Sequence, residues 1–252
     1  MASLVQLSLS RLLLGFFLFL SQPALAVTEN NTFSMATLEQ IPYGFKTTKG
    51  QIKGGLFDIM NEIINESGLK ASNQLLPPQR LIHELKNGNQ LCTLLANTPY
   101  ASRHFDLVEP IGLTLSAGVI PRIGVGLPNY ASLKNTIIAV PLGIYFDKRF
   151  DRDSTLTKIH PLSYSNAIKM LKYKRVDAVA GAIESLLYVA KHDSLSVNDF
   201  GPPLVLSNLN IYLTCIRDTP DFIRKTMRAA TMTLKKRGQI EQIHRQYSIP
   251  KK

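Results

Sequence analysis

The sequence predicts an α/β fold of two lobes, with a mainly parallel sheet covered by helices. Three observations predict it. Short apolar runs of strand character alternate with segments in which apolar residues recur at helical spacing. The order strand, helix, strand, helix, strand early in the chain is typical of a parallel sheet. A second set of such units begins after an extended, glycine-rich stretch at 115–127.

The first 26 residues have the pattern of a secretory signal peptide. Arg11 is followed by the uninterrupted apolar run 12–20, and Ala24 and Ala26 place small residues at the cleavage site. The apolar run is shorter than the roughly 20 residues that a membrane-spanning helix needs. No cysteine follows the site to carry a lipid. We therefore expect a mature chain that starts at Val27 and leaves the cytoplasm without becoming a lipoprotein.

The elements of the first lobe are predicted in order from local signals. Residues 33–38 alternate as a strand does, and Asp58 is placed to cap a helix that ends at Gly68. A short helix follows Pro78 and stops at the Asn87-Gly88 pair. The apolar run 90–96 is a buried strand.

The second lobe begins with a new strand and repeats the alternation. We predict strands at 136–140 and 175–180, a helix at 164–173 capped by Ser163 or Ser165, and a helix at 184–191. A strand at 211–216 leads back, and 220–247 is helical with a break at Gly238. The predicted lobes are 27–115 with 212–252, and 116–211, joined by two crossing segments.

Composition limits the partners. The chain has a formal charge of +11, but its basic residues are spread along the sequence, whereas a nucleic-acid footprint is normally concentrated. We expect no nucleic-acid partner. The five histidines lie far apart in sequence, so we expect no metal site and no cofactor. Cys92 and Cys215 each sit in an apolar, strand-like run, and we expect two buried thiols rather than a disulfide.

Several motifs, in order and spacing, carry a family resemblance. They are the Pro-aromatic opening at 41–45, the glycine and acid at Gly54 and Asp58, the R-L-x-x-x-L-x-x-G helix at 80–88, the block at 105–111, the L-x-x-x-R-V-D-A segment at 171–178 and the closing segment from 213 to 247. Together they resemble the family 3 extracellular solute-binding proteins, the polar-amino-acid receptors of bacterial ABC importers. The resemblance covers about 33–248.

The resemblance implies a type II periplasmic binding protein fold. It implies a monomer in the periplasm that closes over a small solute and delivers it to an ABC permease at the inner membrane. A cleft between two lobes buries most of a ligand's surface, and hinge closure turns ligand contacts into a change of shape.

The chain departs from this family where its amino-acid receptors hold the ligand. The position of the arginine that grips the α-carboxylate holds Ala101, and the position of the acid that holds the α-ammonium holds Ala182. The Gly-Thr turn reads Gly143-Ile144, and the aromatic before the R-L helix is Pro78. We expect a small polar or anionic solute rather than a standard α-amino acid bound in the usual mode.

Eight residues are candidates for ligand contact, each with a structural alternative. Tyr43 either stacks on the ligand or packs under the first helix, and Gly143 either offers backbone N–H groups or only turns the chain. Asn97 and Thr98 follow a central strand, where α/β sheets place ligands. The remaining candidates either face the cleft or have surface or helix-terminal roles: Arg80, Arg103, Tyr145 and Glu184.

Two other functions stay open. A dehydratase of the cyclohexadienyl kind shares this fold and would use Glu184 as a general acid, although no nucleophile or metal constellation accompanies it. A sensing or accessory module for a membrane receptor is the other alternative. We expect a binding protein with no catalytic residues.

Overall fold

The computed structural model describes residues 32–248. The predicted signal peptide and the start at Val27 lie outside the described residues. Within 32–248, no helix combines the length and the apolar character needed to cross a membrane.

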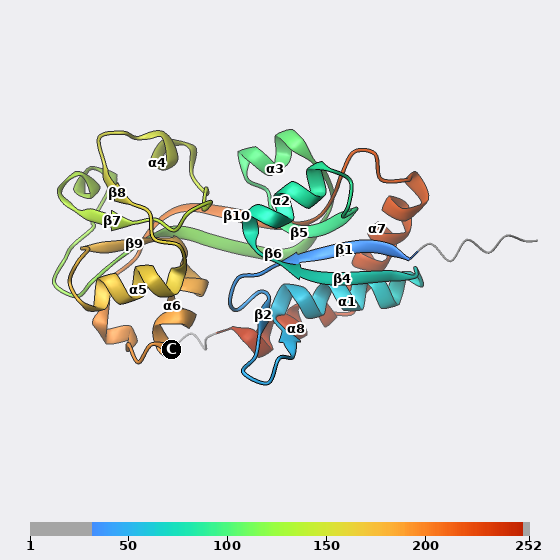
Figure 1. The fold of residues 1–252 in the computed structure, drawn as a ribbon, viewed down its shortest axis with the longest axis horizontal. Coiled ribbons are helices and arrows are strands. Elements are labelled where there is room, and N and C mark those ends of the chain that lie inside the picture. The colour runs from blue at the N-terminus through green and yellow to red at the C-terminus, as the bar shows by residue number, and fades with distance from the viewer. Residues whose placement is uncertain (1–31, 249–252) are drawn as a thin grey trace, which may run out of the picture. The chain divides into compact units, whose positions relative to one another are not determined.

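An eight-stranded sheet runs through the described chain in the order β4-β1-β5-β10-β6-β9-β7-β8, and β2 and β3 form a separate hairpin (Figure 1). The strands are β1 (Phe33–Leu38), β2 (Phe45–Lys46), β3 (Ile52–Lys53), β4 (Ala71–Leu76), β5 (Cys92–Ala96), β6 (Asp106–Pro121), β7 (Ile137–Ala139), β8 (Thr157–Ile159), β9 (Ala178–Ala182) and β10 (Leu204–Cys215). The outer pairs are parallel, whereas β10 is antiparallel to β5 and β6, and β6 to β9. The sheet is therefore mixed, because the chain passes through its centre twice, in opposite directions.

Helices cover both faces of this sheet (Figure 1). They are α1 (Gly55–Ser67), α2 (Pro78–Lys86), α3 (Pro99–His104), α4 (Lys148–Arg152), α5 (Tyr164–Lys172), α6 (Ile183–His192), α7 (Asp221–Lys236) and α8 (Gln239–Tyr247), with 3-10 turns η1 (Tyr130–Asn135) and η2 (Val197–Asp199). Alternate residues of β1 show the layering. Met35 packs with α1 and α7, and Ala36 packs with α2, because successive side chains of a strand point to opposite faces.

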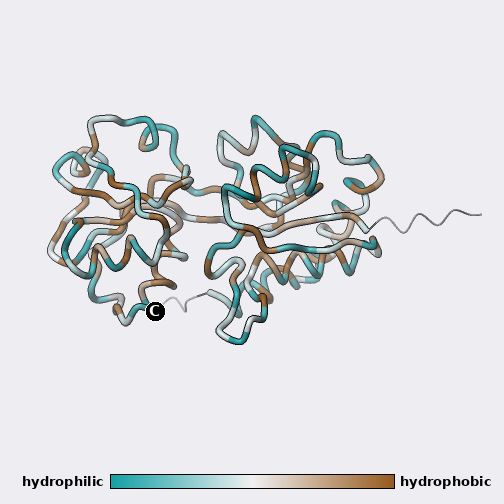
Figure 2. Tube along the Cα trace, viewed as in Figure 1, coloured by the Kyte–Doolittle hydropathy of each residue, from teal (hydrophilic) through white to brown (hydrophobic). Residues whose placement is uncertain are grey.

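The apolar core falls into four clusters. Two of them draw mainly on residues before 114 and after 210, and the other two mainly on residues 115–209. Figure 2 shows hydrophilic residues gathered mainly in the outer loops of the chain. The long strands β6 and β10 contribute to both sets, because each runs from one pair of clusters to the other.

Most of the predicted elements are present, with several boundaries moved, and the strand predicted at 211–216 is the end of the longer β10 (Leu204–Cys215). Asp58 does not cap α1: the helix begins after Gly54, and Asp58 lies in its first turn, where its carboxylate accepts a hydrogen bond from the Tyr247 hydroxyl. The strand predicted at 175–180 forms at Ala178–Ala182, because the backbone at Arg175 still bonds to Met170 at the end of α5. Ser163 caps α5 by accepting from the Asn166 N–H.

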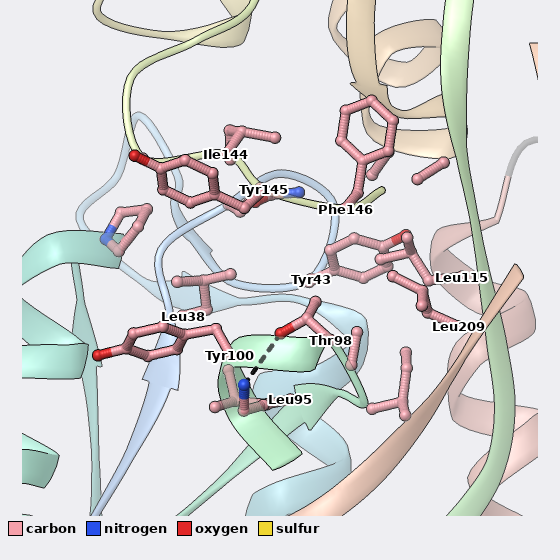
Figure 3. A pocket seen from close by; sticks show the side chains of 18 of the residues that line it. Leu38, Tyr43, Leu95, Thr98, Tyr100, Leu115, Ile144, Tyr145, Phe146 and Leu209 are labelled. Carbon is pink, nitrogen blue, oxygen red and sulfur yellow. Dashed lines mark hydrogen bonds between the residues drawn. The ribbon is translucent and has the colours of Figure 1, made fainter. Parts of the chain in front are cut away.

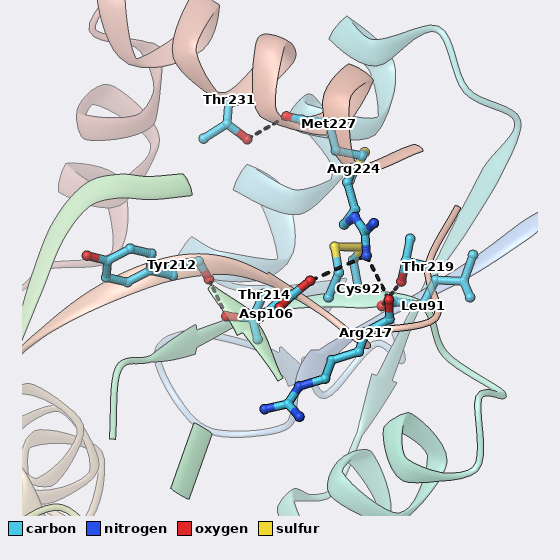
Figure 4. Close-up of a disulfide and its surroundings, with 11 residues drawn as sticks. Leu91, Cys92, Asp106, Tyr212, Thr214, Arg217, Thr219, Arg224, Met227 and Thr231 are labelled. Carbon is cyan, nitrogen blue, oxygen red and sulfur yellow. Dashed lines mark hydrogen bonds and ion pairs between the residues drawn. A yellow bond between two sulfur atoms is a disulfide. The ribbon is translucent and has the colours of Figure 1, made fainter. Parts of the chain in front are cut away.

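The expectation of two buried thiols is wrong. Cys92 and Cys215 are fully buried and joined by a disulfide (Figure 4). They are direct partners in the antiparallel pairing of β5 with β10, with Cα atoms 4.0 Å apart. The two cysteines are 123 residues apart in the sequence, so no local pattern predicts that they are neighbours in the sheet. A disulfide fits an exported protein, because such bonds persist in oxidising compartments.

Arg224 ties the start of α7 to the strands beside the disulfide (Figure 4). Its Nη1 donates to the carbonyl of Arg217 at 2.7 Å and to Oδ2 of Asp106 at 3.3 Å, and its Nη2 donates to Asp221. This cluster and the disulfide hold the end of β10 against β5 and β6.

Candidate functional site

A cavity of about 420 Å³ opens where the carboxyl ends of β1 and β5 face the β7–α4 loop. This is the kind of place where α/β sheets bind ligands, and the volume is in the range of small-molecule sites. Its wall is drawn from many elements: Leu38, Gln40, Tyr43, Leu56, Pro78, Gln79, Ile82, Leu94, Leu95, Ala96, Thr98, Tyr100, Ala101, Leu115, Ala117, Gly143, Ile144, Tyr145, Phe146, Tyr164, Ala182, Leu209 and Ile211.

The lining is mostly apolar. Its polar groups are neutral: the amides of Gln40 and Gln79 and the hydroxyls of one threonine and four tyrosines. No charged side chain belongs to the wall formed by these described residues. Figure 3 shows Tyr100 and Tyr145 on one side of the cavity and Leu115 and Leu209 on the other. The cavity therefore offers hydrogen bonds and apolar contact but no ion pair.

Tyr43 is the most buried of the predicted site residues, at 3% exposed. Its backbone lies against Gly54, where the φ of +143° and a distance of 2.4 Å from an added Cβ to the Tyr43 carbonyl oxygen leave room only for glycine. Burial, followed by the charge of Glu184, raises the pKa of the Tyr43 hydroxyl well above its usual value. The hydroxyl is thus a neutral donor, and it donates to Oε2 of Glu184 at 3.1 Å.

Tyr164 lines the cavity at the start of α5 and was not predicted. Its ring lies over Gly181, whose added Cβ would come within 2.4 Å of the hydroxyl oxygen. That oxygen accepts a hydrogen bond from the backbone N–H of Ala182 at 3.0 Å. Burial raises the pKa of Tyr164 to about 12. The helical pattern around 164–173 marks this tyrosine as an inward-facing residue but does not distinguish a cavity wall from a packed core.

Thr98 joins the cavity wall and caps α3. Its Oγ1 accepts from the Ala101 N–H at 3.1 Å. Asn97 does not belong to the cavity wall: its backbone N–H donates to the Asn210 carbonyl, and its Oδ1 is buried without a hydrogen-bond partner among the described residues.

The two predicted arginines lie outside the cavity wall. The Arg80 side chain is 67% exposed and pairs with Glu84, one helical turn along α2, at 3.5 Å. Arg103 is exposed near the end of α3. The neighbours of Arg80 on α2, Gln79 and Ile82, reach the cavity instead. Helix geometry explains this, because residues adjacent in sequence point about 100° apart around the axis.

Gly143 and Tyr145 both belong to the wall, in the loop after β7. Gly143 has a φ of +80° and packs near the side chain of Gln79. Tyr145 is 67% exposed, so it lies at the opening. Glu184 is not in the wall. It sits in the first turn of α6 behind Tyr43, and its Oε1 is 3.9 Å from Nε2 of His244.

The two alanines that depart from the family pattern both face the cavity. Ala101 is 2% and Ala182 5% exposed, and both belong to the wall. The structure thus brings together Tyr43, Thr98, Gly143 and Tyr145 with these alanines, and leaves out the charged candidates. Within the described residues, no group of three or more His, Cys, Asp or Glu side chains is placed to hold a metal ion.

Solved structures with the same fold include binding proteins and a sensor. A histidine kinase sensor domain with similarity to periplasmic binding proteins matches with a TM-score of 0.74 and 14% identity, over 86% of this chain and 96% of that one. The ligand-binding core of GluR0 from Nostoc punctiforme, in complex with L-glutamate, matches with a TM-score of 0.73 and 18% identity, over 86% and 100%.

An arginine-specific periplasmic binding protein of Salmonella typhimurium matches with a TM-score of 0.70 and 19% identity, over 87% of this chain and 100% of that one. At these identities the matches establish the fold alone, which is the α/β fold of type II periplasmic binding proteins. No curated protein matches the chain in sequence. The model of the bacterial extracellular solute-binding proteins, family 3, matches residues 34–250, and the chain belongs to this family.

Proposed function

We propose that this chain is a periplasmic receptor that binds one small solute in the cavity around Tyr43 and Tyr164, acts as a monomer, and delivers the solute to an ABC-type importer. Family membership and the cavity support the binding role. The solute is not a standard α-amino acid held in the usual mode of the family.

The observation that carries this proposal is the presence of Ala101 and Ala182 in the cavity wall. Each stands at a position where the resemblance implies a charged partner for the amino-acid head group. A zwitterion enclosed here would lose water around two charges and gain no ion pair from the wall, which costs several kcal/mol per charge. Our expectation of an anionic solute also finds no support in the wall, because Arg80 and Arg103 lie outside it.

A thermal-shift and calorimetric screen of the standard amino acids tests the proposal. We expect no saturable binding in the micromolar range. Ser102→Ala, an exposed change next to Ala101, serves as the control for protein quality. Micromolar binding of any standard amino acid would show that the head group finds charged partners elsewhere, and the proposal would then be wrong.

Binding rather than catalysis is the role that the geometry favours. Glu184, the candidate general acid of a dehydratase, lies behind Tyr43 and accepts its hydrogen bond instead of facing the cavity. A Glu184→Gln variant should therefore still bind the solute. Turnover of a cyclic, prephenate-like acid that is abolished by this change would instead assign the chain to the dehydratases.

The likeness to a sensor domain defines the alternative to import. Deleting the gene separates the two roles. Loss of uptake of the labelled solute supports delivery to an importer, whereas normal uptake with a lost transcriptional response to the solute supports sensing.

We also propose the lobe division at 115/116 and 211/212, with closure about the two crossing segments. The separation of the core clusters near residues 114 and 210 supports it. Fluorescent labels on Ser102 and Lys148, which are exposed on opposite sides of this division, should approach each other when the solute is added. An unchanged separation with bound solute would contradict closure.

A further inference from the structure

The side chains of the cavity wall determine which chemical class of solute the cavity favours. Leucines and isoleucines on four strands and α2 form a large part of the apolar residues of the wall, and Figure 3 shows several of them. They are Leu38, Leu94, Leu95, Leu115, Leu209, Ile211 and Ile82. Contact with such side chains favours a ligand in proportion to the apolar surface that it buries.

Two charged side chains that the sequence placed at the site are engaged outside the cavity wall. Oε2 of Glu184 accepts a hydrogen bond from the Tyr43 hydroxyl at 3.1 Å, and Oε1 of Glu184 lies 3.9 Å from Nε2 of His244. Arg80 pairs with Glu84 in solvent. A charged ligand would therefore give up its water without meeting a compensating charge, and the cost of that desolvation is large.

The polar groups of the wall remain neutral over the physiological pH range. Burial keeps the pKa values of Tyr43 and Tyr164 above their usual range. Gln79 and Thr98 add a neutral amide and a neutral hydroxyl to the wall. Such groups orient one hydrogen-bonding substituent of a ligand at small cost.

We propose that the solute is an uncharged small molecule with an apolar body and one or two hydrogen-bonding groups. This inference rests on the proposed binding function and names the class of its ligand. It separates this chain from receptors that select their ligand by an ion pair, because here discrimination comes from the penalty for burying a charge.

Three probes of one shape and different charge test the inference: 2-naphthamide, 2-naphthoate and 2-naphthamidine, which are neutral, anionic and cationic. Calorimetry at physiological salt should show 2-naphthamide binding at least about tenfold more tightly than either charged probe. L-Tryptophan, a zwitterion with an apolar body, is run beside them and should not bind.

The Ala101→Arg variant places a cation in the cavity wall and should reverse the preference, so that 2-naphthoate binds more tightly than 2-naphthamide. Ser102→Arg adds the same charge on the exposed side of the same helix and should leave the wild-type order unchanged. If Ala101→Arg does not fold, Leu209→Arg, at a half-buried position of β10 in the wall, replaces it.

Two results would overturn the ligand class: a charged probe that binds the wild-type protein as tightly as 2-naphthamide, or no binding of any of the three. Binding of L-tryptophan as tight as that of 2-naphthamide would contradict the proposed function instead, because it would restore recognition of an amino-acid head group. The three naphthyl probes thus test the ligand class, and L-tryptophan tests the proposed function.

Discussion

The Tyr43 hydroxyl donates a 3.1 Å hydrogen bond to Oε2 of Glu184, and these residues are 141 positions apart in the chain. Beside them, Nε2 of Gln40 donates to Oγ of Ser185 at 3.0 Å. The loop after β1 is therefore attached to the first turn of α6 by two neighbouring hydrogen bonds. Tyr43 and Gln40 also line the cavity, so both bonds are made by side chains of its wall.

Replacing Tyr43 with phenylalanine should destabilise the protein by about 1–3 kcal/mol, because the partly buried Glu184 carboxylate loses a donor that solvent replaces incompletely. Tyr145→Phe is the matched control, since Tyr145 is 67% exposed, and it should leave the free energy of unfolding unchanged. Urea denaturation measures both. Equal stability of the two variants would mean that the bond contributes nothing.

Alkaline pH should destabilise the protein above about pH 10, the usual pKa of tyrosine in an unfolded chain. Burial raises the pKa of Tyr43 well above that value and the pKa of Tyr164 to about 12. The stabilising contribution is fully present below pH 10. It is lost as pH rises toward the folded-state pKa values, because the unfolded chain releases these protons first.

Tyrosinate absorbance followed during an alkaline titration measures this effect. Four tyrosines have a raised pKa and should ionise late: Tyr43, Tyr130, Tyr164 and Tyr247. The two most buried, Tyr43 and Tyr164, should ionise only together with the loss of native circular dichroism, and Tyr164→Phe should reduce that part of the late component. If every tyrosine of the native protein titrates near pH 10, the burial argument is wrong.

Removal of the disulfide by Cys92→Ser with Cys215→Ser should lower the free energy of unfolding by about 2–5 kcal/mol, since the bond closes a long loop of the unfolded chain. The sequence separation is 123 residues. Thermal denaturation with and without reductant checks this: reductant should lower the Tm of the wild-type protein and leave that of the double variant in place. Solute affinity should be unaffected, because neither cysteine lines the cavity.

Cleavage of the signal peptide should leave Val27 as the N-terminus, because Ala24-Leu25-Ala26 is the small-x-small site after the apolar run. Intact-mass measurement of protein released from the periplasm should show a chain shorter by 26 residues. Ala26→Arg should block processing. Recovery of the full-length chain from the cytoplasm would contradict export.

The sequence predicted those elements whose signals are local. β1, α2, the Ser163 cap and the break at Gly238 follow from alternation, helical spacing and residue-specific backbone preferences. β4 was implied by the strand, helix, strand, helix, strand order, but its residues were not predicted, because its first residues, Ala71-Ser72-Asn73-Gln74, are largely polar and its strand character depends on pairing with β1. The length of β6 was missed for the same reason, since its partners lie about 60–110 residues further along the chain.

The site was predicted least well where the direction of a side chain, and not its position in the sequence, decides whether it faces the cavity. Arg80 lies on the expected helix, but its side chain points into solvent. The side chain of Gln79, one residue earlier on the same helix, lines the cavity instead. Tyr164 carries no local mark of its role, because Gly181, which makes room for its ring, lies on another strand. The disulfide, likewise, depends on a pairing between strands that no local pattern reveals.

The ladder between β6 and β10 is interrupted beside the cavity. Its register shifts between Val205 and Ser207, between Asn210 and Tyr212, and between Leu213 and Thr214. Such bulges bend a strand and loosen its pairing. The wall residue Ile211 lies within the middle shift, and the wall residue Leu209 precedes it. A molecule in the cavity would therefore contact β10 at one of the places where its pairing with β6 is irregular.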